Sequence, residues 1–197
     1  MLREGVLASF IHLRASYNVT GYEISMHIDF SEVKKDPYLK LNPNGRLPTI
    51  DDPNTGLQIW ESGAIVEYLI ETYDKSHLLS YKALPEQWQL KQWLFLQVSG
   101  QAPYYGRAAW FIRPHPEKSY RSARISVGTR QWLVGDKCTY ADLSFIAWQR
   151  WAPRYGGEDI YEKFPHVGAW MERMKARPSV QKVLADQDRA IVEIKGN

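Results

Sequence analysis

The stretch YLKLNPNGRLPTI (residues 38–50) decides the fold of this 197-residue chain. Its residues 42–45 (Asn-Pro-Asn-Gly) predict a turn, because proline presets the backbone angle while asparagine and glycine tolerate positive φ. Residues 47–50 then predict a short strand, and residues 57–60 predict the strand that returns after a hairpin loop over 51–56.

A helix is predicted on the far side of this hairpin, over residues 61–73, where Ile65, Tyr68 and Leu69 share one face. Upstream of the hairpin, the pattern predicts a helix over 7–17, an alternating strand over 22–30 and a short charged helix over 31–39. Such an order of elements within about 75 residues is typical of an α/β unit.

From residue 84 onward every predicted element is helical. The helix that begins at residue 85 is interrupted between Gly100 and Pro103, because proline breaks the helical hydrogen-bond ladder. The predicted helices cover residues 85–101, a continuation to 111, 139–151, 164–175 and 179–186. With a linker at 75–83, we predict an α/β domain over 1–74 and an all-α domain over 84–197.

The composition excludes several classes of protein. With 44% hydrophobic and 24% charged residues the chain can bury a core. A diffuse net charge of +3 does not indicate a nucleic-acid partner, and no apolar stretch is long enough to cross a membrane. The single cysteine, Cys138, excludes an internal disulfide and fits a reducing compartment. Residues 1–10 lack a cleavage site, so we expect a cytoplasmic protein. The eight tryptophans fill a core or line a ligand pocket.

Glu61 and Ser62 stand where the second hairpin strand meets the following helix. The free N–H groups of a helix start bind a carboxylate, the Ser62 hydroxyl adds a donor, and Glu61 can accept an ammonium group. The pair would therefore hold an amino-acid-like group that carries both charges. The alternative is structural: Ser62 caps the helix and Glu61 favours its dipole.

The sequence Arg46-Leu47-Pro48 precedes the first hairpin strand. If the Leu47–Pro48 bond is cis, the main chain of Leu47 can pair with an extended peptide ligand. The alternative is an ordinary trans proline that opens an edge strand.

Residues 135–142 (Gly-Asp-Lys-Cys-Thr-Tyr-Ala-Asp) carry a folding signal. Thr139 and Asp142 have capping-box spacing, and Cys138 and Leu143 occupy the positions of a hydrophobic staple. The staple predicts that Cys138 is buried and unreactive.

Three segments together resemble the cytosolic glutathione-transferase family: residues 38–50, residues 60–65 and residues 132–142. Residues 59–63 and 99–106 resemble its fungal branch, which is related to the yeast nitrogen regulator with a prion domain. The resemblance implies a thioredoxin-like glutathione-binding domain followed by an all-α domain, and a homodimer. It also implies a role in detoxification, with glutathione as cosubstrate and no metal.

By this resemblance, Glu61 and Ser62 hold the γ-glutamyl group of glutathione. The main chain of Leu47, before a cis Pro48, holds the cysteinyl group, and Arg46 reaches a carboxylate. An apolar electrophile would lie near the interrupted helix, where the aromatic residues could equally be core. The residues implied there are Gln101, Tyr104, Tyr105 and Trp110.

The chain departs from the family pattern in two places. The first strand and the loop that activates the glutathione thiol are missing or replaced by residues 1–9, and the helix over 115–130 is shortened. We assign no catalytic residue, since the context of Ser9 does not match.

The resemblance implies conjugation, or glutathione-dependent reduction of peroxides or disulfides. The alternative is a catalytically impaired glutathione-binding protein, and we expect low conjugating activity.

Overall fold

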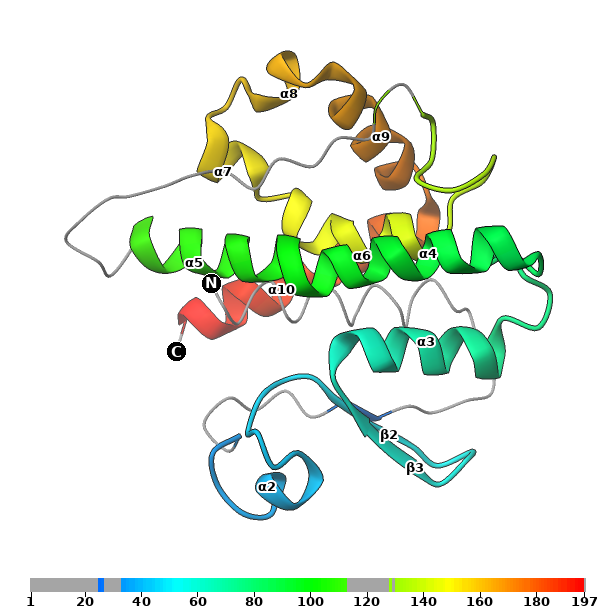
Figure 1. Ribbon diagram of the computed structural model, residues 1–197. Helices are drawn as coiled ribbons and strands as arrows, with labels where there is room; N and C mark the ends of the chain where they lie inside the picture. Colours follow the sequence, from blue (N-terminus) through cyan, green and yellow to red (C-terminus); the bar gives the residue numbers. More distant parts are fainter. Residues whose placement is uncertain (1–24, 27–32, 113–127, 129, 197) are drawn as a thin grey trace.

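The computed structural model describes residues 25–26, 33–112, 128 and 130–196. It places a small sheet at one end of the molecule and a larger group of helices beside it, with α3 between the two (Figure 1). The predicted helix over 7–17, most of the predicted strand over 22–30 and the expected departures at 1–9 lie outside the described residues. So does nearly all of the segment 115–130.

The sheet has three antiparallel strands in the order β1 (Ser25–Met26), β2 (Thr49–Asp52) and β3 (Leu57–Trp60). The predicted hairpin is confirmed, with β2 beginning two residues later than expected. The short helix α2 (Tyr38–Leu41) begins later than the predicted 31–39, because Pro37 precedes it and has no N–H to donate to a helix that started earlier.

Helix α3 (Ser62–Tyr73) confirms the helix predicted over 61–73. Its buried residues Ile65, Val66 and Leu69 belong to the same core cluster as Ile50 of β2. The helix therefore packs against the sheet on one side and lies beside α4 on the other (Figure 1).

The remaining helices surround α6, of which every residue is buried. A helix that is buried all round must lie at the centre of its layer. The helices are α4 (Leu84–Leu96), the π-helix η1 (Gln97–Gln101), α5 (Ala102–Ile112), α6 (Tyr140–Gln149), α7 (Ala152–Gly156), α8 (Ile160–Lys163), α9 (Pro165–Lys175) and α10 (Pro178–Gly196).

The predicted interruption of the long helix takes the form of η1, which joins α4 to α5 without a break. Pro103 lies just after η1 and cannot donate a backbone hydrogen bond, so the local ladder changes there. The short helices α7 and α8 were not predicted.

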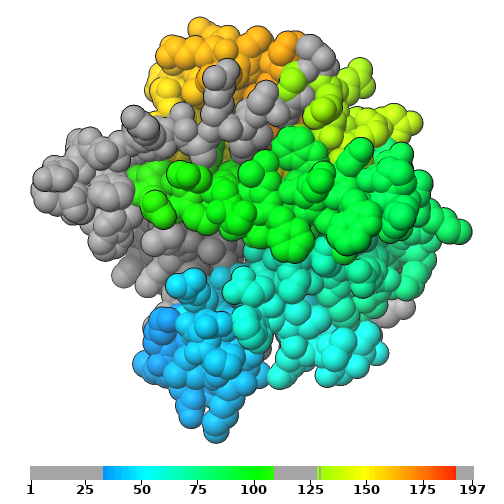
Figure 2. Space-filling model, viewed as in Figure 1, coloured from blue at the N-terminus to red at the C-terminus, as the bar shows by residue number. Residues whose placement is uncertain are grey.

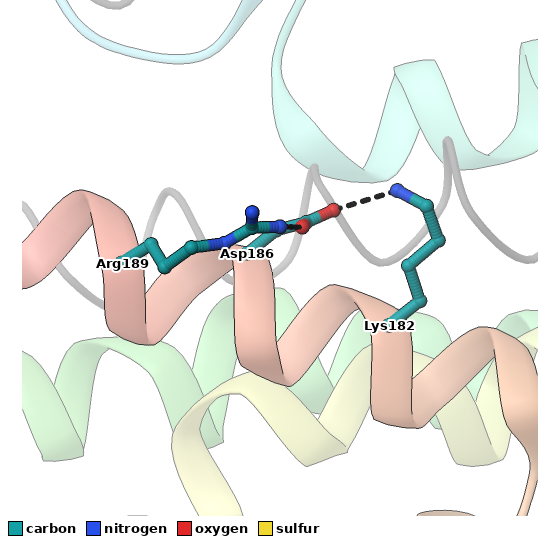
Figure 3. Close-up of polar contacts among 3 residues, drawn as sticks. All are labelled: Lys182, Asp186 and Arg189. Carbon is teal, nitrogen blue, oxygen red and sulfur yellow. Dashed lines mark hydrogen bonds and ion pairs between the residues drawn. The ribbon is translucent and has the colours of Figure 1, made fainter.

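Helix α10 extends ten residues beyond the predicted end at residue 186. Gln187 is completely buried and Arg150 pairs with Asp188, so packing against the end of α6 continues past that point. On its exposed side, α10 carries an ion-pair cluster in which Asp186 accepts from Lys182 and Arg189 (Figure 3).

The folding signal at residues 135–142 is confirmed. Asp142 accepts hydrogen bonds from the N–H (2.9 Å) and the hydroxyl (2.8 Å) of Thr139, which forms the capping box at the start of α6. Cys138 is 3% exposed and Leu143 is 1% exposed, and both belong to the main core. Burial, with a smaller effect of the Asp142 charge, raises the pKa of the Cys138 thiol to about 12.

The tryptophans divide between core and surface. Trp148 and Trp170 are buried, whereas Trp60 and Trp88 are exposed. The core reading is therefore confirmed for part of the set, and the ligand-pocket reading stays a prediction.

Candidate functional site

The register of the hairpin brings the two predicted binding motifs together. Thr49 pairs with Trp60, and the strands are antiparallel. The residues just before Thr49 therefore lie beside those just after Trp60, which places Leu47 and Pro48 next to Glu61 and Ser62. The Leu47–Pro48 peptide bond is cis.

The loop that carries Leu47 is held from behind by three buried side chains. The Tyr38 hydroxyl donates to the carbonyl oxygen of Arg46 (2.8 Å), and the Asn42 amide donates to the same oxygen (2.7 Å). Tyr38 also bonds the Thr49 hydroxyl at 2.8 Å. Because two donors fix the Arg46 carbonyl, the next residue, Leu47, has a defined position.

Gly45 completes this support. Its φ of +55° favours glycine, and a Cβ there would lie 2.6 Å from the carbonyl oxygen of Val33. No other residue can occupy this position without moving the loop. The side chain of the next residue, Arg46, is exposed.

The start of α3 carries no side-chain cap. Glu61 is the N-cap residue. The capping role that the sequence left open for Ser62 is thus not adopted. The first helical hydrogen bond runs from the Ile65 N–H to the Glu61 carbonyl oxygen, so the N–H groups of residues 62–64 have no acceptor within the helix. Glu61 is exposed and Ser62 is half-buried.

The position of α3 relative to the hairpin is fixed by Asp52, which is completely buried at the end of β2. Tyr68 donates to its carboxylate at 2.5 Å, and Tyr73 donates to the same oxygen. Burial by itself would raise the pKa of Asp52, but the hydrogen bonds from Tyr68, Tyr73 and Asn54 lower it below its ordinary value. The charged carboxylate therefore anchors α3 at the end opposite to Glu61 and Ser62.

The π-helix lies beside the start of α3. A Cβ on Gly63 would lie 3.4 Å from Cγ1 of Val98 in η1. This approach makes η1 the part of the helical layer that borders the Glu61–Ser62 junction. Such a place fits the general observation that π-helical turns are frequent at functional sites.

The four residues predicted to line a second-substrate pocket are spread over η1 and α5. Gln101 is buried and donates to the Phe145 carbonyl oxygen and to Gln149, both at 3.3 Å. Tyr105 is buried and donates to the same Gln149 oxygen at 3.2 Å. Tyr104 is 53% exposed, and the Trp110 side chain lies outside the described residues.

Sequence reasoning missed the supporting residues Tyr38, Asn42, Thr49 and Val98. The signal available for Asn42 was its place at the start of the predicted turn, where asparagine commonly bonds backbone two residues on, as it does with Asn44 N–H at 3.1 Å. The other three reveal their role only through contacts that are distant in sequence.

Within the described ranges, no three or more His, Cys, Asp or Glu side chains form a group that could hold a metal ion. None of the helices searched there has the length and apolar character needed to cross a membrane.

Comparison with known proteins identifies the family. The model of the glutathione S-transferase N-terminal domain matches residues 2–71, and that of the C-terminal domain matches residues 118–178. The glutathione S-transferase-like protein gedE of Aspergillus terreus is 44% identical over 81% of this chain and 82% of its own length. Glutathione S-transferase 1 of Schizosaccharomyces pombe is 34% identical over 84% and 85%.

Solved structures agree with this assignment. The glutathione transferase URE2P6 of Phanerochaete chrysosporium, crystallised with oxidized glutathione, is 32% identical. It covers 94% of this chain and 92% of its own, with a TM-score of 0.78. The thioredoxin-like and all-α architecture and the relation to fungal Ure2-type proteins are thereby confirmed. The chain belongs to the glutathione S-transferase family.

Proposed function

We propose that this protein is a glutathione transferase whose glutathione site is the junction of β2, β3 and α3. The single observation that carries the proposal is the hairpin register, which sets Leu47 and Pro48 beside Glu61 and Ser62. Glutathione has an amino-acid head with both charges and an extended backbone. The junction offers a group for each part.

Each residue has a distinct role in this proposal. The N–H groups of residues 62–64 and the Ser62 hydroxyl hold the γ-glutamyl carboxylate, and Glu61 holds the ammonium group. The main chain of Leu47 pairs with the cysteinyl residue, as an added strand would. Arg46, which is exposed beside it, reaches the second carboxylate.

The reaction uses glutathione as a nucleophile. In conjugation, the thiolate sulfur forms a bond to an electrophilic carbon of an apolar substrate, and the leaving group departs with the electron pair of the broken bond. In peroxide reduction, two glutathione thiols become a disulfide while the peroxide becomes water and an alcohol. A free thiol is only a few per cent ionised at neutral pH, as for an ordinary cysteine. The site must therefore stabilise the thiolate and align the electrophile with it.

The apolar substrate would lie where η1 meets the start of α3, near Gln101, Tyr104, Tyr105 and Trp110. Of these, Tyr104 has the exposed ring that a substrate can touch, whereas the Gln101–Gln149–Tyr105 network holds η1 in shape. Tyr104→Ala should raise KM for the electrophile several-fold and leave the glutathione Kd unchanged. An unchanged KM would remove Tyr104 from the pocket.

A direct test of the glutathione site is calorimetric titration of the chain with glutathione. Ser62→Ala should weaken binding by about 1–3 kcal/mol, the scale of a lost charge-assisted hydrogen bond, which is roughly 5- to 150-fold in Kd. Ser76→Ala is the matched control, because Ser76 is exposed in the linker. Equal glutathione affinity in both variants would refute the site.

The second candidate function is a glutathione-binding protein with impaired catalysis. One observation favours it: two buried hydroxyls of the loop that carries Leu47, those of Tyr38 and Thr49, bond each other, and Tyr38 also donates to the Arg46 carbonyl. Both therefore support the loop. Glutathione binding without conjugation or peroxide reduction would select this candidate, and turnover of a standard aryl halide electrophile would reject it.

We further propose a homodimer that acts in detoxification in the cytoplasm, with the domain division 1–74 and 84–197. Helices α4 and α5 cross one open face of the molecule (Figure 2). Leu84, Trp88 and Phe95 of α4 are each at least 60% exposed, which is unusual for large apolar side chains on a monomer. The Trp88→Ser variant should contain more monomer than the wild-type protein. A monomer mass for the wild-type protein by light scattering at micromolar concentration would refute the dimer.

A further inference from the structure

A cavity of about 320 Å³ lies at the C-terminal half of α3, away from the proposed glutathione site. Its walls come from α3, the linker that follows it, α4 and the first residue of α6. Figure 1 shows how α3 and α4 run side by side and are joined by this linker. The cavity therefore touches both the sheet-bearing part of the chain and the helical part.

Most polar groups around this cavity are already engaged. Asp74, in the linker wall, accepts hydrogen bonds from the N–H groups of Leu78 (2.8 Å) and Leu79 (3.1 Å) and from the Ser80 hydroxyl (2.7 Å). On the opposite wall, Lys91 of α4 pairs with Glu67 of α3 at 2.8 Å. These bonds fix the shape of the cavity.

Two polar groups of the wall are less fully engaged: the Tyr140 hydroxyl, and the Glu71 carboxylate, which forms only a long ion pair with Lys91. Tyr140 is only 5% exposed, and its hydroxyl makes no hydrogen bond within the described part of the chain, although the residue lines the cavity. The Glu71 carboxylate has Lys91 as its nearest basic group, at 4.0 Å, and its side chain is 74% exposed. The hydroxyl oxygen itself is not fully enclosed and opens on the cavity, so a molecule bound there can hydrogen-bond to it.

The charge around Tyr140 is negative. Burial of the ring, together with the charges of Glu67 and Glu71, raises the pKa of Tyr140, so the hydroxyl keeps its proton. The wall contains three carboxylates, of Glu67, Glu71 and Asp74, against two ammonium groups, of Lys75 and Lys91. Lys75 donates to the Glu71 carbonyl oxygen at 2.8 Å, and Lys91 is held by Glu67. A cation would thus balance the site, and Leu90 and Ile70 add apolar surface.

We propose that this cavity binds a small organic cation, a primary ammonium or guanidinium group on a compact apolar body. The cation lies between the Glu71 carboxylate and the oxygen of Tyr140, and its apolar body contacts Leu90 and Ile70. Such a ligand bridges α3, the linker and α6. Because it binds only the folded arrangement, it raises the melting temperature of the protein.

The test uses the full chain and benzylamine as the probe, with benzyl alcohol and benzoate as the neutral and anionic counterparts of similar shape. Affinity is measured by calorimetry and by the shift in melting temperature. Benzylamine should bind at least about tenfold more tightly than benzyl alcohol, the scale of one hydrogen bond to a charged group. Benzoate should not bind.

Variants identify the site. Glu71→Gln, at an exposed position that does not threaten folding, should weaken benzylamine binding about tenfold, and Tyr140→Phe should weaken it several-fold. Glu158→Gln removes an exposed charge elsewhere and should have no effect. Absence of benzylamine binding, equal binding of benzyl alcohol, or equal affinities in Glu71→Gln and Glu158→Gln would each overturn the proposal. Glutathione affinity, titrated separately, should be unchanged in all three variants.

Discussion

Replacement of Asp142 should be among the most damaging single changes in this protein. The carboxylate is completely buried at the start of α6 and accepts four hydrogen bonds. One oxygen accepts from the Leu133 N–H and the Trp170 indole N–H, both at 2.9 Å. The other accepts from the N–H and the hydroxyl of Thr139. One side chain therefore joins α6, α9 and the segment that precedes the helix.

The expected loss follows from the donors left behind. Each buried group without its partner costs about 1–3 kcal/mol, and the variant also loses the capping box. Some donors will find water or rotate, so the four penalties do not add fully. We expect Asp142→Ala to lower the free energy of unfolding by about 4 kcal/mol, near the upper limit for single substitutions. For a chain of this length, that is a fall in melting temperature of roughly 10 °C.

Two milder variants give a graded series. Asp142→Asn keeps one acceptor for the Leu133 and Trp170 donors but presents its amide to the Thr139 N–H, so about 2 kcal/mol should be lost. Thr139→Val removes the hydroxyl that donates to Asp142 and that accepts from the Asp142 N–H in the capping box, and it should cost about 1–2 kcal/mol. Urea unfolding at pH 7, followed by circular dichroism and tryptophan fluorescence, measures all three. If Asp142→Ala costs no more than Thr139→Val, the four hydrogen bonds do not hold these elements together.

Three further predictions concern single residues. Cys138 should not react with a maleimide at pH 8 until urea unfolds the protein, and labelling of the native protein would contradict its burial. Folding raises the pKa of the Cys138 thiol from 9.0 to about 12. The stability that this thiol contributes is therefore complete below pH 9 and is lost as the pH rises toward 12. Gly45→Ala should lower the free energy of unfolding by more than about 1 kcal/mol and weaken glutathione binding. Gly56→Ala is the control, because Gly56 has a similar φ of +71° but no atom within 4 Å of the new Cβ, so only the backbone cost should appear. Equal losses of stability would exclude the contact behind Gly45. Asp186 lies at the centre of the exposed ion pairs in Figure 3, and Asp186→Asn should lower the free energy of unfolding by less than about 1 kcal/mol in a urea titration. A larger loss would mean that the cluster does more than neutralise surface charge.

The sequence alone determined the elements whose signals are local. The hairpin over residues 49–60, helix α3 and the capping box at Thr139 and Asp142 each depend on residues within a few positions of one another. Turn residues, apolar periodicity and cap spacing act at that range, so the pattern was sufficient to place them. The assignment of Leu47 and Glu61 to one glutathione-binding site came from the resemblance of two short motifs to one family.

Tertiary structure decided what those local signals leave open. Whether Gln101 and Tyr105 face a ligand or a partner depends on Gln149, 48 and 44 positions away, which receives both hydrogen bonds. The length of α10 depends on the end of α6, because Gln187 and Asp188 pair with Arg150. The cavity beside Tyr140 exists only because α3, the linker, α4 and α6 converge there. Burial and partner choice are properties of the packed chain, and a residue's sequence neighbours do not fix which distant side chain will satisfy it.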